Sequence, residues 1–450
     1  MAVAAGIPAG LFPTASMADA ATRPRLRACL DCGQFQILPA MAPGTVARCN
    51  RCDAGLRRVR HDPLGRGLAL NLTALALLVI ACTATLLTVS TFGMYRSATV
   101  LSGPLGFGQH HVWALAAVVA FMTVLAPLLR LALVTYVLLG LRMPTPPPHL
   151  RGAFRIAERI RPWSMVEVYL LGVFVAFTEL PGSVHVDVGI GVYALIVLMV
   201  TIVAADAVLD RQAVWEAMER RGMTDIAADR ARTVQTAPLT GALTCETCRL
   251  VCLPAAEEEP SCPRCGSRLE ARKPNSIART WALVVASAVL YVPANLLPVL
   301  AFVEFGSGQP HTIIGGAEEL LNAGMWPLAL LVFLASIGVP CLKLVSLVLL
   351  LVTTQAGSSW QLRQRTILYR LVSAIGRWSM IDIFMASVLI ALVQFGSVVT
   401  IDPGLGAVAF AGVVILTMFA AESFDPRLMW DAALLRYGAR SVSWAPLICR

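Results

Sequence analysis

Eight cysteines are the residues of this sequence whose spacing most clearly indicates chemistry. They form four Cys-x-x-Cys pairs, and the pairs come in twos, separated by sixteen and by thirteen residues. Four thiolates match the tetrahedral coordination that structural zinc prefers. A redox dithiol, metal-free cysteines or an iron site are the alternatives, because four thiolates also hold iron. The two expected zinc sites consist of Cys29, Cys32, Cys49 and Cys52, and of Cys245, Cys248, Cys262 and Cys265.

Two basic residues lie inside long apolar runs, where a charge costs about 2.5–3.5 kcal/mol on insertion scales. Arg130 follows Pro127 by three positions, and Lys343 follows Pro340 in the same way. Each proline is expected to kink its helix and to free a carbonyl near the charge. An ion pair at such a place serves helix packing alone, or it lines a polar cavity for a lipid headgroup or an ion. The expected partners are Glu167 for Arg130 and Asp382 for Lys343.

Asp382 belongs to a motif that occurs twice, 215 positions apart. Each copy reads Trp-Ser-Met, an aliphatic residue and a carboxylate, and each opens a long apolar run; Ser379 is the serine of the second copy. A second echo at the same offset closes each half with an aspartate and a later tryptophan–acid pair. The chain is therefore predicted to be one module written twice. The motif copies are 163–167 and 378–382, and the closing echoes are 210–216 and 425–431.

The stretch Pro-Ala-Asn-Leu-Leu-Pro, 293–298, lies toward the outer end of the fifth apolar run. Pro293 and Pro298 are expected to leave the backbone broken there, and Asn295 to satisfy a freed group. The first half lacks this stretch. If the stretch carries function, the second half is the active copy; a structural kink is the alternative.

Thr201 and Thr417 occupy places that look alike in the two halves, and we expect each hydroxyl to bond back to its own helix. The sequence contains no Ser/His/Asp set, phosphate-binding loop or HExxH motif. It therefore gives no indication of an enzyme.

The composition is that of an integral membrane protein. Of the 450 residues, 57% are apolar and only 14% are charged, whereas a soluble domain carries about 25% charged residues. The net charge of +9 does not indicate nucleic-acid binding, because the basic residues follow membrane topology. Eight runs approach the length of about 20 residues that a spanning helix requires. These runs are 68–92, 113–140, 163–180, 188–209, 277–303, 325–354, 378–398 and 405–422.

The lysine and arginine counts in the loops predict the orientation in the membrane. The segment before the first span has nine, the loops after spans two and six have five and four, the central segment ten and the tail four. The loops after spans one, three, five and seven have one, none, none and none. Both termini and both ribbons are therefore expected in the cytoplasm, where zinc thiolates persist. The outward loops are short, so no sizeable domain is expected outside.

These observations predict an all-α membrane protein, with eight transmembrane helices in two tandem four-helix repeats. Each repeat is preceded by a small cytoplasmic zinc ribbon. The expected divisions are a disordered tail 1–22, zinc ribbon one 23–66, repeat one 67–222, a linker with zinc ribbon two 223–274, repeat two 275–431 and a tail 432–450.

The combined motifs resemble the paraquat-inducible protein A family of inner-membrane lipid-transport proteins. The paired cysteines, the stretch 291–298, Pro340-Cys-Leu-Lys343, the motif 378–382 and the closing echo 424–431 carry the resemblance. The resemblance implies a multi-pass protein of the bacterial inner membrane and a periplasmic partner with mammalian-cell-entry (MCE) domains. Together they would move phospholipid between membranes. The first half departs from the family pattern in lacking the Pro-Ala-Asn stretch and in carrying Arg130 in place of a lysine.

Two other functions stay open at this level. A membrane redox protein would use the thiolate sites for iron, and an ion-coupled exporter or channel would use the intramembrane charges as a relay. The residues predicted to serve lipid transport are Lys343, Asp382, Ser379, Pro340, Asn295, Pro293, Pro298, Thr417, Arg130 and Glu167.

Overall fold

Eight helical segments of the computed structural model are long and apolar enough to cross a membrane. They form two sets of four, and each set follows a ribbon that contains four clustered cysteines, so the predicted fold class is confirmed. The structure describes residues 25–91, 94–179, 185–224, 242–252, 261–304, 307–322, 324–393 and 399–437; the expected tail 1–22 and residues 438–450 lie outside this part. The spans are Pro63–Thr83, Trp113–Gly140, Leu150–Thr178, Ile190–Val208, Ser276–Leu296, Ala329–Gln355, Leu362–Leu392 and Leu405–Ser423.

The first and last spans of each repeat form a closely packed pair. Helix α1 (Pro63–Thr83) packs on α7 (Ile190–Val208), and α10 (Ser276–Leu296) packs on α16 (Leu405–Ser423). Helix α1 begins after Asp62, whose side chain accepts a hydrogen bond from the Gly65 amide at 3.1 Å. Proline at its first position needs no amide partner, so residue type and helix start agree.

The second span of each repeat contains a π-helical turn. In repeat one, α3 (Trp113–Ala120) passes through η2 (Phe121–Leu125) into α4 (Ala126–Gly140). In repeat two, α12 (Trp326–Phe333) passes through η4 (Leu334–Gly338) into α13 (Val339–Gln355). Pro127 and Pro340 follow directly, so the kink expected at each proline takes the form of a π-turn that shifts the hydrogen-bond ladder by one residue.

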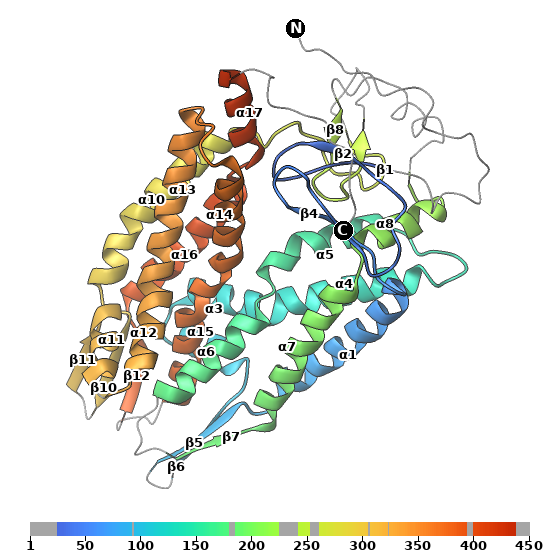
Figure 1. The fold of residues 1–450 in the computed structure, drawn as a ribbon. Coiled ribbons are helices and arrows are strands. Elements are labelled where there is room, and N and C mark those ends of the chain that lie inside the picture. Colours follow the sequence, from blue (N-terminus) through green and yellow to red (C-terminus); the bar gives the residue numbers. More distant parts are fainter. Residues whose placement is uncertain are drawn as a thin grey trace, which may run out of the picture.

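The third spans meet at the centre of the molecule (Figure 1). Helix α5 (Leu150–Ile160) leads through η3 (Arg161–Trp163) into α6 (Val166–Glu179), and α14 (Leu362–Ile375) leads through η5 (Gly376–Met380) into α15 (Ile381–Leu392). A Cβ at Gly172 would lie 2.8 Å from the Cβ of Phe384, so α6 and α15 approach closely. Every residue of α15 is buried, and this helix forms the core between the two repeats.

The loops opposite the ribbons fold into two small antiparallel sheets, which the sequence analysis did not foresee. Strands β6 (Met94–Ala98), β5 (Leu87–Thr91) and β7 (His185–Val188) form one. Strands β11 (Ser307–His311), β10 (Leu300–Glu304) and β12 (Val399–Pro403) form the other. The expected first and fifth spans, 68–92 and 277–303, therefore end early as helices, because their last residues enter β5 and β10. We call this end of the molecule the sheet end (Figure 1).

A short helix lies beside each sheet, and its packing differs between repeats. Helix α2 (Ser102–Gln109) packs on α15 of the other repeat. A Cβ at Gly103 would lie 2.0 Å from the Oγ of Ser387 on α15. Helix α11 (Ile313–Asn322) is its counterpart in repeat two. Each short helix packs on the second span of its own repeat, α2 on α3 and α11 on α12, and the contact of α2 with α15 is additional. Among the described residues, no atom lies within 4 Å of a Cβ built at Gly316.

The two ribbons lie together at the opposite end, which we call the ribbon end (Figure 1). The first has two hairpins, β1 (Arg25–Ala28) with β2 (Phe35–Leu38) and β3 (Val46–Arg48) with β4 (Gly55–Arg58). The second pairs β8 (Leu243–Thr244) with β9 (Val251–Cys252) and adds a bridge from Ser261 to Arg268. Helices α8 (Arg211–Arg220) and α17 (Arg427–Tyr437), which follow the last span of each repeat, lie at the same end.

Candidate metal centres and a polar cluster in the membrane

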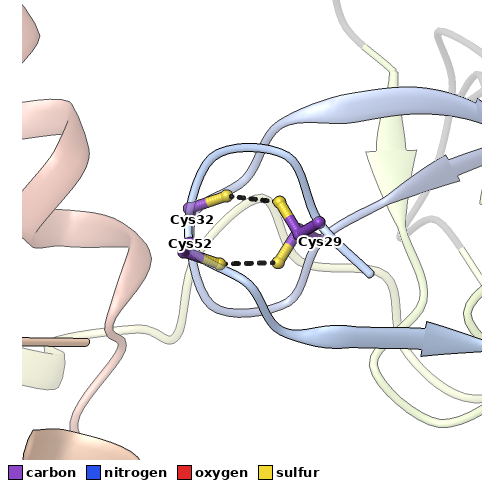
Figure 2. Close-up of side chains that lie close together, drawn as sticks. Cys29, Cys32 and Cys52 are labelled. Atoms are coloured by element: carbon purple, nitrogen blue, oxygen red, sulfur yellow. Dashed lines mark hydrogen bonds between the residues drawn. The ribbon is translucent and has the colours of Figure 1, made fainter. Parts of the chain in front are cut away.

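The first ribbon brings its four cysteines into one buried group. Their sulfur atoms all lie within 4.8 Å of one another, with 3.5 Å between the Sγ atoms of Cys29 and Cys52 and 3.6 Å between those of Cys32 and Cys49. Figure 2 shows the sulfur atoms of Cys29, Cys32 and Cys52 converging. A tetrahedron with zinc–sulfur bonds of about 2.3 Å has edges of about 3.8 Å. The group therefore fits one tetrahedral metal ion.

Two tight turns position these thiols. The amide of Gly33 donates to the carbonyl of Cys29 and that of Asp53 to the carbonyl of Cys49, both at 2.9 Å. Gln36 on β2 donates its Nε2–H to the Cys49 sulfur at 2.9 Å. Such a donor stabilises the negative charge of a metal-bound thiolate. Gln36 was missed by the sequence analysis, because nothing in its spacing from the cysteines distinguishes it.

The second ribbon repeats the arrangement. The Sγ atoms of Cys245 and Cys265 lie 3.4 Å apart, and those of Cys248 and Cys262 lie 3.5 Å apart. All four are buried and form a second group of possible metal ligands. Cys252 is buried nearby but stays outside this group. Both sets of sequence-predicted ligands are thus brought together.

The cation of repeat two is fully buried, but it does not contact the expected partner. Lys343 on α13 is 1% exposed. Its ammonium donates to the hydroxyl of Thr417 at 2.7 Å and to the carbonyl of Gly376 at 3.4 Å. The predicted ion pair with Asp382 is absent from the described residues. The reason is the corner at η5, which places the Gly376 carbonyl against the ammonium before the chain reaches Asp382.

Asp382 is a buried carboxylate with little compensation. Neither of its oxygens accepts a well-formed hydrogen bond from the described residues. Ser336 on the π-turn η4 lies beside it, but the Ser336 hydroxyl donates to the carbonyl of Val332 at 2.7 Å. The hydroxyl of Ser379 is buried and likewise lacks a partner in the described part of the chain. Buried polar groups are normally hydrogen-bonded, so the Asp382 carboxylate and the Ser379 hydroxyl are candidates for a functional site.

The cation of repeat one is paired, again not with the expected residue. Arg130 on α4 forms an ion pair with Asp206 on α7, and Arg161 approaches the same carboxylate at 3.5 Å. The expected pairing with Glu167 is therefore wrong. Asp206 was missed, although it is the one acidic residue in the apolar run 190–208 and could have been found on that ground. At the offset of 215, its place in repeat two is taken by Ala421.

The matching of the two threonines also needs correction. The offset of 215 relates Asp210 to Asp425, and it places Ile202, not Thr201, opposite Thr417. Thr201 donates to the carbonyl of Val197 at 2.7 Å, as expected for a packing hydroxyl. Thr417 donates to the carbonyl of Val414 at 2.9 Å and also accepts from Lys343. Repeat one therefore has no hydroxyl at the place of Thr417.

The Pro-Ala-Asn stretch lies at the sheet end of α10. The expected break at Pro293 is wrong, because the helix runs through this proline and ends only at Leu296, before Pro298. Asn295 donates its Nδ2–H to the carbonyl of Tyr291 at 2.8 Å, so its amide satisfies a backbone group as expected. The carbonyl of Pro298 accepts from the amide of Gly406 at 3.1 Å, which ties the broken end to α16.

Tyr291 connects this end of α10 to the π-turn of the sixth span. Its hydroxyl lies 3.4 Å from the carbonyl of Ile337 and 3.3 Å from the sulfur of Cys341. Tyr291 thus links the Pro-Ala-Asn stretch to the segment that carries Pro340 and Lys343.

Comparison with known proteins gives a consistent result. The family model "Paraquat-inducible protein A" matches the chain twice, over residues 64–219 and 277–433. The "Intermembrane transport protein PqiA" of Escherichia coli strain K12 is 33% identical over 403 residues, which are 90% of this chain and 95% of that protein. The "Lipophilic envelope-spanning tunnel protein A" of the same strain is 30% identical over 404 residues, 90% and 91% of the two chains.

A "Probable intermembrane transport protein" of Haemophilus influenzae is 34% identical over 178 residues, 39% of this chain and 42% of that one. No solved structure matches the chain.

Proposed function

Because the chain belongs to the paraquat-inducible protein A family, we propose that it is the inner-membrane component of an intermembrane phospholipid transport system in bacteria. It would pass lipid to or from a periplasmic tunnel formed by a partner with MCE domains. The names of its relatives support an intermembrane transport role rather than an enzymatic one.

The observation that carries this proposal is the buried polar cluster of repeat two. Lys343 is a buried cation whose hydrogen-bond partners among the described residues are neutral. Ser379 on η5 and Asp382 at the start of α15 are buried polar groups without hydrogen-bond partners in the same part of the chain. An intramembrane ionisable group is costly and is by default a functional candidate. A cation that no protein carboxylate neutralises is suited to a phosphate group, which is the charged part common to phospholipids.

The remaining predicted residues fit supporting roles in this proposal. Thr417 holds the ammonium while the site is empty, and Pro340 follows the π-turn that places Lys343. The stretch with Pro293, Asn295 and Pro298 would shape the exit toward the sheet end. In repeat one, Arg130 is already neutralised, so it and Glu167 would contribute less to lipid binding.

The two cysteine groups would each hold one structural zinc ion. Four buried thiolates without an open position favour a structural over a catalytic site. Metal analysis of the purified protein should give two zinc ions per chain. A content well below two, or an equal amount of iron, would favour the redox alternative.

The ribbon end would face the cytoplasm and the sheet end the periplasm, as the arginine distribution predicts. Two exposed serines test this orientation: Ser97 on β6 and Ser359 between α13 and α14. In a chain without other reactive thiols, Ser97→Cys should react with an impermeant maleimide on intact cells, and Ser359→Cys should react only after lysis. The reverse pattern would invert the proposed topology and place the ribbons, not the sheets, on the periplasmic side.

The test of function is the double variant Lys343→Met with Asp382→Leu. Each group is buried without a charged partner among the described residues, so its replacement by an apolar residue of similar size strands no charge and the variant should fold. We expect folded yield close to that of the parent and loss of complementation of an envelope-lipid defect. A folded variant that still complements would show that the cluster serves packing alone.

A matched control and a second readout complete this test. Arg130→Met with Asp206→Leu removes the ion pair of repeat one in the same way and should retain most complementation. Phospholipid should copurify with the parent and be reduced in the repeat-two variant. Absence of bound lipid from the parent, together with an ion flux that depends on Lys343, would favour an exporter or channel.

A further inference from the structure

The first ribbon docks on the repeat that it does not precede. The guanidinium of Arg51 lies 4.2 Å from the ring centroid of Trp430 on α17. Arg370 on α14 donates to the carbonyl of Cys52, a predicted metal ligand, and also pairs with Asp31 at 3.0 Å. The ribbon's cysteines share an apolar cluster with residues of repeat two, including Leu347, Leu350, Val372, Phe424 and Met429.

The second ribbon makes the reciprocal choice and docks on repeat one. Arg155 on α5 donates to the carbonyls of Gly266, at 3.0 Å, and Cys265, at 3.4 Å. Gln212 on α8 donates to the carbonyl of Cys248 at 3.1 Å. The cysteines of this ribbon share an apolar cluster with Phe154, Trp215 and other residues of repeat one. The ribbons are therefore crossed with respect to the repeats that they precede.

The crossing follows the internal symmetry of the chain. Arg155 and Arg370 are 215 positions apart, and each donates to the carbonyl of the last cysteine of the opposite ribbon. Each ribbon is also tethered to its own repeat by a bidentate arginine–carboxylate pair at the same offset. These pairs are Arg57 with Glu216, at 2.9 and 3.1 Å, and Arg272 with Asp431, at 2.6 and 2.9 Å.

Arg155 and Arg370 each contact a ribbon from the helix that leads into a 3-10 turn, η3 in repeat one and η5 in repeat two. These two turns differ in the contacts that hold them within their own repeat. In repeat one, Arg161 at the start of η3 pairs with Asp206, so α5, η3 and α7 are held together without help from the ribbon. In repeat two, Gly376 occupies the place of Arg161 and offers only its carbonyl, to Lys343. Helix α14, which runs into η5, is held on its own repeat by Tyr369, whose hydroxyl donates to the carbonyl of Ala421 at 3.2 Å, and by Thr366, which accepts from the indole of Trp430 at 3.1 Å. Arg370, one residue after Tyr369, adds the contact with the first ribbon.

We propose that Arg370 is a positioning residue for the polar cluster: it ties the metal-loaded first ribbon to α14 and thereby sets the place of the Gly376 carbonyl that holds Lys343. The expected loss of lipid transport rests on the proposed function, whereas the positioning of α14 by the first ribbon does not. The four thiolates of the first ribbon fit a tetrahedral ion. Such an ion would fix the backbone at Cys52, whose carbonyl accepts the hydrogen bond from Arg370. Arg155 makes the matching contact beside the corner at η3, which the ion pair of Arg161 with Asp206 already holds. The loss of Arg155 should therefore change the position of that corner less.

The experiment uses the full-length chain in which the four cysteines outside the two metal groups, Cys82, Cys252, Cys341 and Cys449, are replaced by serine. Ser379→Cys, a buried and nearly isosteric reporter in η5, is alkylated with a membrane-permeant maleimide in detergent. Arg370→Met should raise the alkylation rate about tenfold or more, because the corner opens locally, while the protein keeps two metal ions per chain. Arg155→Met should leave the rate within about twofold of the parent.

Two further measurements test the role of the ribbon. Removing the metal with a chelator also frees the eight ribbon thiols, so alkylation is measured on the peptide that contains position 379 alone. Its rate should rise as in Arg370→Met, and the chelator should have little added effect in that variant. Asp31→Asn removes only the ion pair and should give an intermediate rate, which covers the case in which Arg370→Met fails to fold. The proposal is overturned if Arg370→Met or Asp31→Asn folds and the reporter stays as slow as in the parent.

A transport assay separates this inference from the proposed function. Arg370→Met should fail to complement an envelope-lipid defect, whereas Arg155→Met should complement. If the reporter responds as expected but Lys343→Met with Asp382→Leu still complements, the proposed function fails and the positioning role stands. If that double variant fails to complement but Arg370→Met leaves the reporter unchanged, the positioning role fails and the function stands.

Discussion

The two repeats place a cation at the same point of their second span, directly after a π-turn and a proline, and then treat it differently. Arg130 of repeat one is neutralised by Asp206 from the fourth span. Lys343 of repeat two has a threonine hydroxyl and a backbone carbonyl as partners, because Ala421 stands where Asp206 would be. The same scaffold therefore holds a cation neutralised by a carboxylate in one copy, and in the other a cation whose partners among the described residues are neutral.

The loss of the ion pair in repeat one should give the largest effect on stability. Asp206→Ala strands the buried guanidinium of Arg130, and removing one partner of a buried pair costs about 3–5 kcal/mol. We expect the lower end of this range, because Asp206 keeps some exposure. Thermal unfolding in detergent measures the loss. Asp382→Asn removes the buried carboxylate of repeat two and should cost little, since this carboxylate has no hydrogen-bond partner among the described residues. Equal losses in the two variants would remove the distinction between the repeats.

The short helices of the sheet end should also respond unequally. Gly103→Ala forces a Cβ against Ser387, and overpacking of this kind costs about 1–3 kcal/mol. Gly316→Ala, 213 positions later, meets open space and should be neutral or raise stability by up to about 1 kcal/mol, because alanine favours a helix over glycine. Melting temperatures of the two variants test this. A similar loss in both would mean that α11 packs on repeat one in the membrane as α2 packs on repeat two.

Much of this comparison could be read from the sequence. The duplicated cysteine pairs, the offset of 215 and the long apolar runs are local patterns, and they predicted the two cysteine groups that could hold a metal ion and the eight spans. That the second half is the active copy stays a prediction. The partners of the cations could not be derived, because a span-two arginine faces carboxylates of several spans at similar depth. Asp206 and Glu167 were both available, and only the packing of α4 on α7 decides between them.

The crossed ribbons and the sheet end depend on contacts between distant residues. Each ribbon stands directly before its own repeat, so the sequence suggests that it docks there, and the opposite choice follows from contacts such as Arg370 with Cys52. Strands β5 and β7 are separated by about a hundred residues, and their short apolar stretches merge with the ends of the spanning runs. No local pattern distinguishes them from helix.

Asp210 and Asp425, the aspartates of the two closing echoes, should give the smallest difference in stability between the repeats. This difference should also depend on pH. Burial alone would raise the pKa of Asp425, but hydrogen bonds from Arg427 at 2.8 Å outweigh it and hold the pKa below its usual range. Burial raises the pKa of Asp210, because Arg57 at 3.6 Å offsets it only in part. Asp425→Asn should therefore destabilise by about 1–2 kcal/mol at pH 7, and Asp210→Asn by less.

The pH dependence follows from the lowered pKa of Asp425. Its carboxylate contributes fully above the unfolded pKa of about 3.9 and loses that contribution as pH falls through the folded pKa. The stability gap between parent and Asp425→Asn should stay constant from pH 8 to pH 5 and shrink below about pH 4. A gap that instead grew as pH fell would mean that the folded pKa of Asp425 is raised.

The most direct test of the difference between the repeats introduces into repeat two the carboxylate that neutralises the cation of repeat one. Ala421→Asp places a carboxylate in repeat two where Asp206 stands in repeat one, within the helix that already contacts Lys343 through Thr417. The control Ala421→Asn has the same size without the charge. Complementation of an envelope-lipid defect, with folded yield measured in parallel, should be lost in Ala421→Asp and largely kept in Ala421→Asn. An Ala421→Asp protein that folds and complements as well as the parent would contradict a transport role for the unpaired Lys343.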